Sequence, residues 1–209
     1  MSKTDEVLAG FGEVQRDVPL SRMTTLRIGG ESAYVFYPGS LVGLDLAVRY
    51  LDQENVPFKL IGKGSDILAS DDRYEGVVIR LDKHMHAVYF HGEEMIAEAG
   101  ASIVSLANQA MKKGLSGLEF ASGIPGTLGG GIFMNAGAYG GEMKDVIYSV
   151  THIDNEGKLG SIKSNDLKLG YRHSVYKENG FTIIGVILKL KLDSKNSIMI
   201  NSWKIKMFV

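Results

Sequence analysis

The sequence predicts an α+β fold for this chain of 209 residues. Three observations support it: an amphipathic helical pattern, short apolar runs rich in strand-forming residues, and glycine-rich segments that separate these runs. The order helix, strand, glycine-rich loop, strand is typical of an α/β or α+β unit. The length also allows a real core, because a chain of ~150 residues already buries about 68–70% of its unfolded surface.

The first half of the chain predicts one helix followed by two apolar strands. The helix covers residues 41–56, where the apolar positions follow the spacing i, i+3, i+4 and i+7: Leu44, Ala47, Val48 and Leu51. The run FKLI at 58–61 predicts a strand, and VVIRL at 77–81 predicts a second strand after a glycine-rich loop.

The second half predicts more strands around a second helix. Residues 87–99 form two strands around a turn at His91 and Gly92, and a helix follows between a cap at Ser102 and a left-handed end at Gly114. Two further strand-like runs, 146–154 and 181–192, lie on either side of a turn at 155–157.

Composition excludes several classes of function. With 23 basic and 24 acidic residues, the chain lacks the basic character of a nucleic-acid or anionic-membrane binder. No cysteine is present, so disulfides, thiolate metal sites and a Cys nucleophile are excluded. Residues 1–20 lack the apolar core of a signal peptide, and we expect a cytoplasmic protein without membrane or nucleic-acid partners. Composition does not predict the oligomeric state.

Glycine is the unusual component, with 26 residues that cluster in two places. The first cluster, Gly62-Lys63-Gly64-Ser65, follows a predicted strand, where successive backbone N–H groups can form an anion-binding nest. Because it lacks the third glycine of the dinucleotide fingerprint and the G-K-[ST] of a P-loop, an ordinary tight turn remains the favoured interpretation of this loop alone.

The second cluster is denser, with eight glycines among the 19 residues from Gly123 to Gly141. Each glycine costs ~0.5–1 kcal/mol in conformational entropy relative to alanine, so a ligand or close packing must compensate. Polar and apolar side chains are interleaved with the glycines, which suits a large flat ligand with a polar tail. The alternative is a mobile linker, but linkers are polar and half of this segment is apolar.

Four motifs together resemble one family. The segment GLEFASGIPGTLGGGIFMNAGAYGGEM at 117–143 closely resembles the signature of the UDP-N-acetylenolpyruvoylglucosamine reductase family, flavoenzymes of peptidoglycan precursor synthesis. PLSRMTTLRIGG at 19–30, GKGSDIL at 62–68 and LGYRHSVYK at 169–177 are similar to other motifs of that family, in the same order. The resemblance covers about residues 16–192.

The resemblance implies an FAD-binding domain of the vanillyl-alcohol-oxidase (PCMH) type, with two α+β subdomains and the flavin between them. It implies that the first loop faces the FAD pyrophosphate and that the second lines the pyrophosphate and isoalloxazine. The FAD-binding residues implied are Gly62, Lys63, Gly64, Ser65, Asp66, Ser122, Gly123, Ile124, Pro125, Gly126, Gly129, Gly130, Asn135, Ala136 and Gly137. Asp66 departs from the family's Asn, and we expect it to face away from the phosphates or to accept backbone N–H groups.

The implied chemistry is NADPH-driven reduction of a UDP-sugar enolpyruvyl ether, UDP-N-acetylglucosamine-enolpyruvate, to UDP-N-acetylmuramate. The first loop has no His or Cys, so we expect FAD to be bound noncovalently. Arg172 matches the family's catalytic arginine, whose guanidinium suits a substrate carboxylate, and Tyr171 is expected near the substrate. Outside the family, an arginine at this place is more often a surface salt-bridge partner.

The expected organisation is a lead segment at 1–20, an FAD-binding domain at 21–192 with subdomains of about 21–83 and 84–192, and an atypical tail at 193–209. In the family, the proton-donating Ser and the assisting Glu lie in a C-terminal substrate domain, which we expect to be absent. Ser197 and Ser202 of the tail are interpreted as solvated. The alternative to an active reductase is therefore a catalytically incomplete FAD-binding module.

The histidines do not predict a metal site. His84 and His86 have the H-x-H spacing of one strand face, with His91 nearby, but no acidic or Cys ligand follows at a matching interval. An ordinary polar hairpin face is the favoured interpretation, and we expect no metal.

Overall fold

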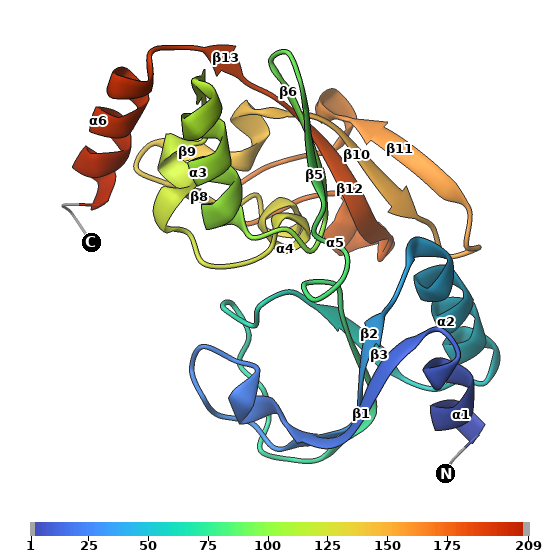
Figure 1. Ribbon diagram of the computed structural model, residues 1–209. Helices are drawn as coiled ribbons and strands as arrows, with labels where there is room; N and C mark the ends of the chain where they lie inside the picture. The colour runs from blue at the N-terminus through green and yellow to red at the C-terminus, as the bar shows by residue number, and fades with distance from the viewer. Residues whose placement is uncertain (1–2, 207–209) are drawn as a thin grey trace. The chain divides into compact units, whose positions relative to one another are not determined.

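The computed structural model describes residues 3–206 and divides into two compact units. Unit 1 comprises Met1–Met85 with Glu156–Lys158, and unit 2 comprises His86–Asn155 with Leu159–Val209. Figure 1 shows helices and strands in both units. For the residues described, the α+β class is therefore confirmed.

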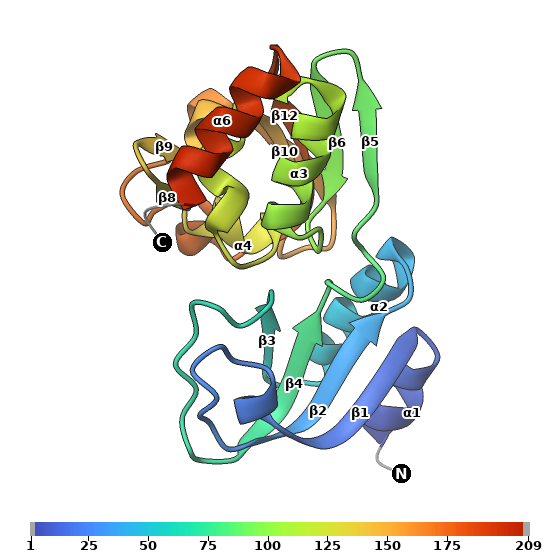
Figure 2. The same ribbon diagram turned by 60° about the vertical axis from the view of Figure 1, so that its left-hand side comes forward.

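Unit 1 is a four-stranded sheet with two helices. Its strand order is β1-β2-β4-β3, with β1 antiparallel to β2 and the other neighbours parallel. In Figure 2 these strands lie side by side, and α1 and α2 lie against one face of the sheet. Its elements are α1 (Lys3–Ala9), β1 (Gly12–Pro19), the 3-10 helix η1 (Leu20–Arg22), β2 (Glu31–Pro38), α2 (Leu41–Gln53), β3 (Phe58–Ile61) and β4 (Tyr74–Arg80).

The predicted helix and strands of unit 1 are confirmed. Helix α2 begins after Ser40, whose hydroxyl accepts a hydrogen bond from the Gly43 N–H at 3.0 Å, as an N-cap should. The predicted apolar stripe of α2 is buried along its whole length, from Leu44 to Leu51. Strand β3 has the predicted bounds, while β4 begins three residues earlier than the run 77–81.

Residues 3–20 are structural parts of unit 1. They form α1 and β1, and β1 pairs with β2 from Gly12 to Pro19. Asp5 of α1 is buried and forms an ion pair with Arg16 of β1, which joins the helix to the sheet edge. The lead segment expected at 1–20 therefore contributes a helix and a strand, although residues 1–2 lie outside the described part of the chain.

Unit 2 is a five-stranded antiparallel sheet of order β11-β10-β12-β6-β5 with helices packed on it. Helix α4 contacts β12 and β6, while α6 packs against η2 and α3. Its elements are β5 (Val88–His91), β6 (Glu94–Glu98), α3 (Ile103–Lys113), β7 (Leu115–Ser116), η2 (Glu119–Gly123), α4 (Leu128–Phe133), β8 (Gly137–Ala138), β9 (Gly141–Glu142), η3 (Met143–Asp145), β10 (Ile147–Ile153), β11 (Leu159–Lys163), η4 (Ser164–Asp166), α5 (Tyr176–Asn179), β12 (Thr182–Lys189), β13 (Lys191–Leu192) and α6 (Lys195–Lys206).

Most local predictions for unit 2 are confirmed. Gly92 has a φ of 59° in the turn between β5 and β6, and Gly114 ends α3 with a φ of 72°. Ser102 stands at the N-cap of α3, but its side chain accepts no capping bond, and the first N–H of the helix, on Ile103, donates instead to the Gly126 carbonyl. His84 and His86 lie in a turn and a loop, so the expected strand face there is wrong.

The tail is ordered as α6 over the residues that the structure describes. Ile198 and Ser202 are buried, whereas Met199, Ile200 and Trp203 are exposed. The interpretation of Ser202 as solvated is therefore wrong, because α6 turns it toward the helices on which it packs. Residues 207–209 of the tail lie outside the described residues.

A buried histidine on β10 makes the stability of unit 2 depend on pH. His152 is 5% exposed, stacks on Phe181 and shares a hydrogen bond of 3.1 Å with the Tyr176 hydroxyl. Burial lowers the pKa of His152 below its usual value near 6.5, while the Asp154 carboxylate opposes that shift. The unfolded chain therefore binds this proton first as the pH falls.

We expect the free energy of unfolding to be highest above pH 6.5 and to fall as the pH drops from 6.5 through the lower pKa of folded His152. Urea unfolding between pH 5 and 8 measures this slope. A His152→Gln variant should lose part of the slope, whereas His91→Gln, at an exposed position, should keep it. Equal slopes in all three proteins would contradict the assignment.

Candidate functional site

In unit 1, two loops are interlocked beside the carboxyl end of β3. The Thr25 N–H donates to the Gly64 carbonyl at 3.0 Å, and the Gly30 N–H donates to the Ser70 carbonyl at 2.8 Å. Residues 20–30 and 62–72, which carry two of the four recognised motifs, therefore fix each other's backbone. The first glycine loop is thus a supported structure and not an isolated tight turn.

Gly64 is required where these loops meet. Its φ is 68°, in the left-handed region that favours glycine, and a Cβ at this position would lie 1.9 Å from the Met23 carbonyl oxygen. Any side chain would push the two loops apart. The neighbouring predicted residues are more open, because Lys63 and Asp66 are exposed and Ser65 is half-buried.

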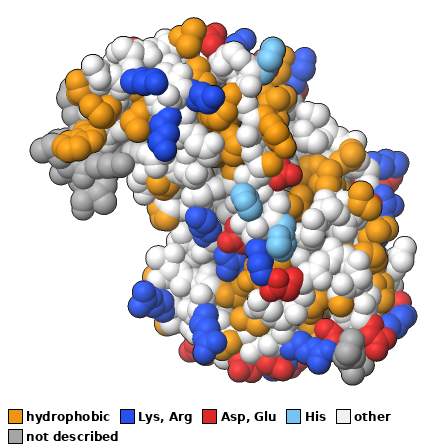
Figure 3. All heavy atoms as spheres, viewed as in Figure 1, with side chains coloured by type: hydrophobic (Ala, Val, Ile, Leu, Met, Phe, Trp, Pro, Cys, Tyr) orange, Lys and Arg blue, Asp and Glu red, His pale blue; other side chains and the backbone are white. Residues whose placement is uncertain are grey.

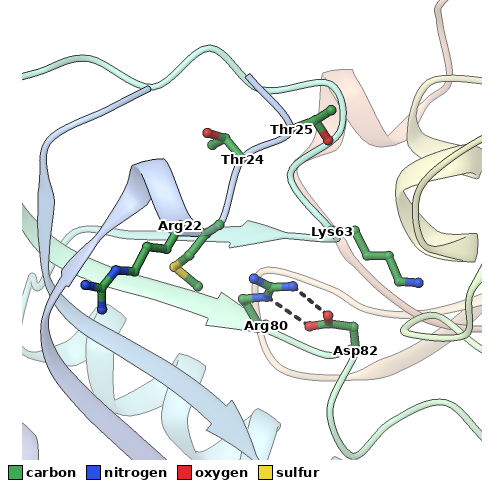
Figure 4. Close-up of a pocket in the computed structure, with 7 residues that line it drawn as sticks. Arg22, Thr24, Thr25, Lys63, Arg80 and Asp82 are labelled. Atoms are coloured by element: carbon green, nitrogen blue, oxygen red, sulfur yellow. Dashed lines mark hydrogen bonds and ion pairs between the residues drawn. The ribbon is translucent and has the colours of Figure 1, made fainter. Parts of the chain in front are cut away.

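The interlocked loops border an open depression of about 290 Å³ (Figure 4). Arg80, at the end of β4, donates to the Asp82 carboxylate at 2.9 and 2.5 Å, and the pair is largely shielded from solvent. The side chains of Arg22 and Lys63 extend in opposite directions in this view, and within residues 3–206 neither forms an ion pair. The depression is lined by Arg22, Met23, Thr24, Thr25, Lys63, Arg80 and Asp82.

Of the residues that line this depression, only Lys63 was predicted from the sequence as a cofactor-binding residue. Arg22, Thr24 and Thr25 belong to the recognised segment at 19–30, so the motif contained the signal without assigning roles. Thr24 is buried, and its hydroxyl donates to the Ile28 carbonyl at 3.0 Å, which shapes the loop. On the face shown in Figure 3, unit 1 carries both acidic and basic side chains and no large patch of one sign.

In unit 2, the second glycine cluster folds as η2, the short helix α4 and the β8–β9 hairpin. Thr127 caps α4, with its hydroxyl accepting from the Gly130 N–H at 3.4 Å. The Gly129 N–H donates to the Ala99 carbonyl and the Gly131 N–H to the Thr127 carbonyl, at 2.8 and 2.9 Å. These backbone N–H groups are therefore already bonded within unit 2. Gly129 can touch a ligand by van der Waals contact, but its N–H is not available to donate to one.

Close packing explains two glycines of α4. A Cβ on Gly131 would lie 2.7 Å from the Ile103 Cδ1 atom, and one on Gly129 would lie 3.0 Å from the Ala99 Cβ atom. These contacts let α4 approach α3 and the end of β6 closely. The entropy cost of the cluster is thus partly offset by packing within unit 2.

Ser122 offers an unused hydrogen-bonding group. The residue is 5% exposed, and among the described residues its Oγ has no hydrogen-bond partner, an arrangement that costs ~1–3 kcal/mol in a buried site. At the next residue, a Cβ on Gly123 would meet nothing within 4 Å, so open space adjoins the backbone of residue 123. Such a buried donor beside open backbone fits a polar ligand.

The other predicted residues of the second cluster differ in exposure. Gly123, Pro125 and Gly130 are exposed, Ile124, Gly129 and Gly137 are half-buried, and Gly126, Asn135 and Ala136 are buried. Gly137 faces its partner strand so closely that a Cβ would lie 2.8 Å from the Gly141 carbonyl oxygen. The exposed members therefore provide surface, and the buried ones shape the backbone beneath it.

Asn135 links the glycine cluster to the segment that carries Arg172. It is 2% exposed and has a φ of 42°. Its Nδ2 donates to the Gly170 carbonyl at 2.9 Å and to the Glu142 carboxylate, and its Oδ1 accepts from the Lys144 N–H at 3.0 Å. Asn135 is therefore fully engaged within unit 2.

Tyr171 and Arg172 form the tip of a tight turn. Gly170 and His173 close it with two backbone hydrogen bonds of 3.1 and 3.2 Å, and Tyr171 is 92% exposed. Arg172 has a φ of 52° and lies 5.7 Å from the centre of the Tyr171 ring. Within residues 3–206 its guanidinium makes no ion pair, so the structure does not support the surface salt-bridge interpretation.

Within the described residues, no group of three or more His, Asp or Glu side chains is arranged to hold a metal ion. None of the helices that the structure describes is both long enough and apolar enough to cross a bilayer.

Comparison with known proteins gives one consistent family. The family model described as FAD binding domain matches residues 32–162. UDP-N-acetylenolpyruvoylglucosamine reductase from Lactobacillus acidophilus is 37% identical over 187 residues, which are 90% of this chain and 62% of the relative. The enzyme of that name from Caldanaerobacter subterraneus is 39% identical over 191 residues, 91% of this chain and 63% of the relative. The chain thus spans less than two thirds of these relatives.

Solved structures agree with the sequence relatives. The crystal structure of UDP-N-acetylenolpyruvylglucosamine reductase from Thermus caldophilus superposes with a TM-score of 0.83 at 30% identity, covering 95% of this chain and 70% of that one. A solvent-stable cholesterol oxidase, at a TM-score of 0.64 and 14% identity, shares the fold alone. The FAD-binding-domain type of fold expected from the sequence is confirmed, and the chain belongs to the UDP-N-acetylenolpyruvoylglucosamine reductase family and carries its FAD binding domain.

Proposed function

We propose that the chain binds FAD noncovalently through the two glycine-rich segments. The observation that carries this proposal is Ser122, whose buried hydroxyl lacks a partner among the described residues beside the open backbone of Gly123. The proposed contacts are Gly62, Lys63, Gly64, Ser65 and Asp66 in unit 1, and Ser122, Gly123, Ile124, Pro125, Gly126, Gly129, Gly130, Asn135, Ala136 and Gly137 in unit 2.

The unit 1 loop suits the phosphates of the cofactor. Gly64 lets the backbone turn without a side chain, and Lys63 and Arg22 provide positive charge that no carboxylate neutralises within the described chain. Asp66 is exposed, in keeping with a carboxylate that stays away from phosphate. In unit 2, the engaged amides of α4 leave Gly129 and Gly130 to contribute surface, and Asn135 to support that surface from below.

The reaction we propose is reduction of UDP-N-acetylglucosamine-enolpyruvate to UDP-N-acetylmuramate with NADPH, in the cytoplasm. Its support is the name shared by the relatives of known sequence and structure. Bound FAD would carry the hydride from NADPH to the enolpyruvyl double bond, which gains a hydride and a proton while NADPH becomes NADP⁺. Because the chain spans 62–63% of those relatives, the full reaction is a proposal for the chain described here.

Arg172 is the proposed catalytic residue. Hydride addition places negative charge on the carbon next to the substrate carboxylate, and a fixed guanidinium fork stabilises such charge. Arg172 is exposed at the tip of an anchored turn and makes no ion pair in the described part of the chain, so its fork remains available. Tyr171, beside it and 92% exposed, is the proposed substrate contact.

A second candidate is an FAD-binding module that does not complete the reduction by itself. The chain spans 62–63% of the enzymes that it matches, and the experiment below tests whether this span completes the reduction. The two candidates are separated by one preparation, loaded with FAD and mixed with NADPH. Rapid NADPH oxidation only after addition of the enolpyruvyl substrate supports the reductase, whereas a yellow protein without substrate-stimulated oxidation supports the module. A protein that takes up no FAD would contradict both.

Ser122→Ala gives opposite effects with and without FAD if the hydroxyl is a cofactor ligand. Without FAD, the variant removes an unsatisfied buried hydroxyl, so the free energy of unfolding should stay equal or rise by about 1 kcal/mol. With FAD, the lost hydrogen bond should weaken binding about fivefold to tenfold. Urea unfolding and flavin absorbance titration measure the two effects.

Ser116→Ala is the matched control for this experiment. The Ser116 hydroxyl donates to the Glu119 carboxylate at 2.7 Å in the same unit, so its loss should destabilise the protein and leave FAD affinity within about twofold. Unchanged FAD affinity in Ser122→Ala would remove the hydroxyl from the cofactor site.

A further inference from the structure

The position of Arg172 depends on the base of its turn, because the tip has few contacts of its own. The guanidinium forms no ion pair within the described residues, and Tyr171 next to it is almost fully exposed. We propose that Asn135 and Ser174 are positioning residues for Arg172, and that through them the glycine-rich segment and the turn move together. The inference rests on the proposed function only in that Arg172 acts on the substrate.

Asn135 holds the side of the turn that precedes Arg172. Its Nδ2 points to two acceptors, the Gly170 carbonyl and the Glu142 carboxylate, and its Oδ1 points to the N–H of Lys144. This pattern fixes the orientation of the Asn135 amide, because a flipped amide would place its oxygen against the acceptor oxygens of Gly170 and Glu142. A hydrogen bond from the Lys144 side chain lowers the pKa of Glu142 against the opposing effect of desolvation, and the hydrogen bond from Asn135 adds to the lowering, so the acceptor stays ionised near neutral pH.

Ser174 holds the side of the turn that follows Arg172. It is fully buried, and its hydroxyl donates to the carbonyl of Phe133 at 2.8 Å. Phe133 is the last residue of α4, where a helix leaves carbonyl groups without helical partners. Ser174 therefore satisfies a helix end and fastens the turn with the same bond.

The two anchors converge on one short segment. Both sides of the turn are tied to residues 133–135, the end of α4 within the glycine cluster. A further contact to the turn differs from these two anchors because it is exposed. In it, the Lys177 amino group donates to the Arg172 carbonyl at 3.0 Å. A shift of the α4 end when FAD occupies the cluster would therefore reach Arg172 through the Asn135–Gly170 and Ser174–Phe133 hydrogen bonds. Asn135 therefore belongs to the glycine-rich segment proposed to bind FAD and at the same time holds the turn that carries Arg172.

Hydrogen exchange of the protein without FAD tests the anchors directly. The Gly170 and His173 amides close the turn, so their exchange should quicken about fivefold to tenfold in Asn135→Gly and in Ser174→Ala. Glycine is chosen at 135 because the φ there is positive. Amides of the β10–β12 ladder should not change, and neither should the turn in the matched controls Asn155→Gly and Ser116→Ala, which each remove one hydrogen bond elsewhere in unit 2.

The coupling is tested by repeating the exchange with saturating FAD, whose binding is followed by flavin absorbance. In the unaltered protein, FAD should slow exchange at His173. Ser174→Ala, whose residue is not among the proposed FAD contacts, should bind FAD but lose this slowing. Asn135→Gly should also lose it at FAD concentrations that saturate the variant. If Asn135 and Ser174 only stabilised the turn locally, the variants would change the His173 exchange rate without FAD, but FAD would still slow that exchange. Should Asn135→Gly fail to fold, Ser174→Ala examines the same turn from its other side.

The outcomes separate this inference from the proposed function. Unchanged His173 exchange in both variants would overturn the anchors, and FAD binding without any effect at His173 in the unaltered protein would overturn the coupling. Failure of the unaltered protein to bind FAD would contradict the proposed function and the coupling, whereas the exchange measured without FAD would still decide the anchors.

Discussion

Gly64→Ala should lower the free energy of unfolding by about 2–4 kcal/mol and weaken FAD binding by at least about tenfold. The added Cβ would lie 1.9 Å from the Met23 carbonyl oxygen, and the backbone there has a φ of 68°. The two loops must separate to admit it, which breaks the bond from the Thr25 N–H to the Gly64 carbonyl. Urea unfolding and flavin titration measure the two losses.

The control Gly92→Ala separates the cost of a left-handed backbone conformation from the cost of a steric clash. Gly92 has a similar φ of 59°, but a Cβ there would meet nothing within 4 Å. This control should lose only the ~1–2 kcal/mol of a left-handed alanine and should bind FAD as before. If Gly64→Ala and Gly92→Ala lose equal free energy of unfolding, the close contact between Gly64 and the Met23 carbonyl does not stabilise the two loops. If Gly64→Ala binds FAD normally, the first loop does not belong to the cofactor site.

Local signals in the sequence predicted the elements whose formation depends on near neighbours. The stripe from Leu44 to Leu51 predicted α2, and Gly92 and Gly114 predicted a turn and a helix end, because each pattern acts within a few residues. The four motifs identified the family for a similar reason, since each is a short contiguous run. Both glycine-rich loops can therefore be recognised from the order of the amino acids alone.

Contacts between distant residues could not be predicted in this way. The Asn135 bond to Gly170 and the Ser174 bond to Phe133 join residues 35 and 41 positions apart, and no local pattern specifies them. Helix α4 is a further case, because Gly129 and Gly131 disfavour a helix until packing against Ala99 and Ile103 requires their small size. Tertiary contacts thus show that Asn135, predicted as a cofactor ligand, also supports the turn that carries Arg172.

Arg172→Met should lower kcat/KM for the enolpyruvyl substrate by about 10²–10³, the effect of removing one stabiliser of developing negative charge. The FAD affinity should stay within about twofold, because the Arg172 side chain is exposed at a turn tip and the anchors of that turn are buried. Arg172→Lys should recover only part of the rate, since an ammonium keeps the charge but lacks the planar fork that fits a carboxylate. Substrate-stimulated NADPH oxidation and flavin titration measure the rate and the affinity.

Lys163→Met is the matched control, because it removes one exposed positive charge from β11 in the same unit. It should leave both kcat/KM and FAD affinity unchanged, which would show that the effect at 172 does not come from net charge. A loss of FAD affinity in Arg172→Met as large as its loss of rate would assign the guanidinium to the cofactor instead of the substrate. A rate within tenfold of the unaltered protein would contradict the catalytic role, since ~1.4 kcal/mol is less than one such interaction supplies.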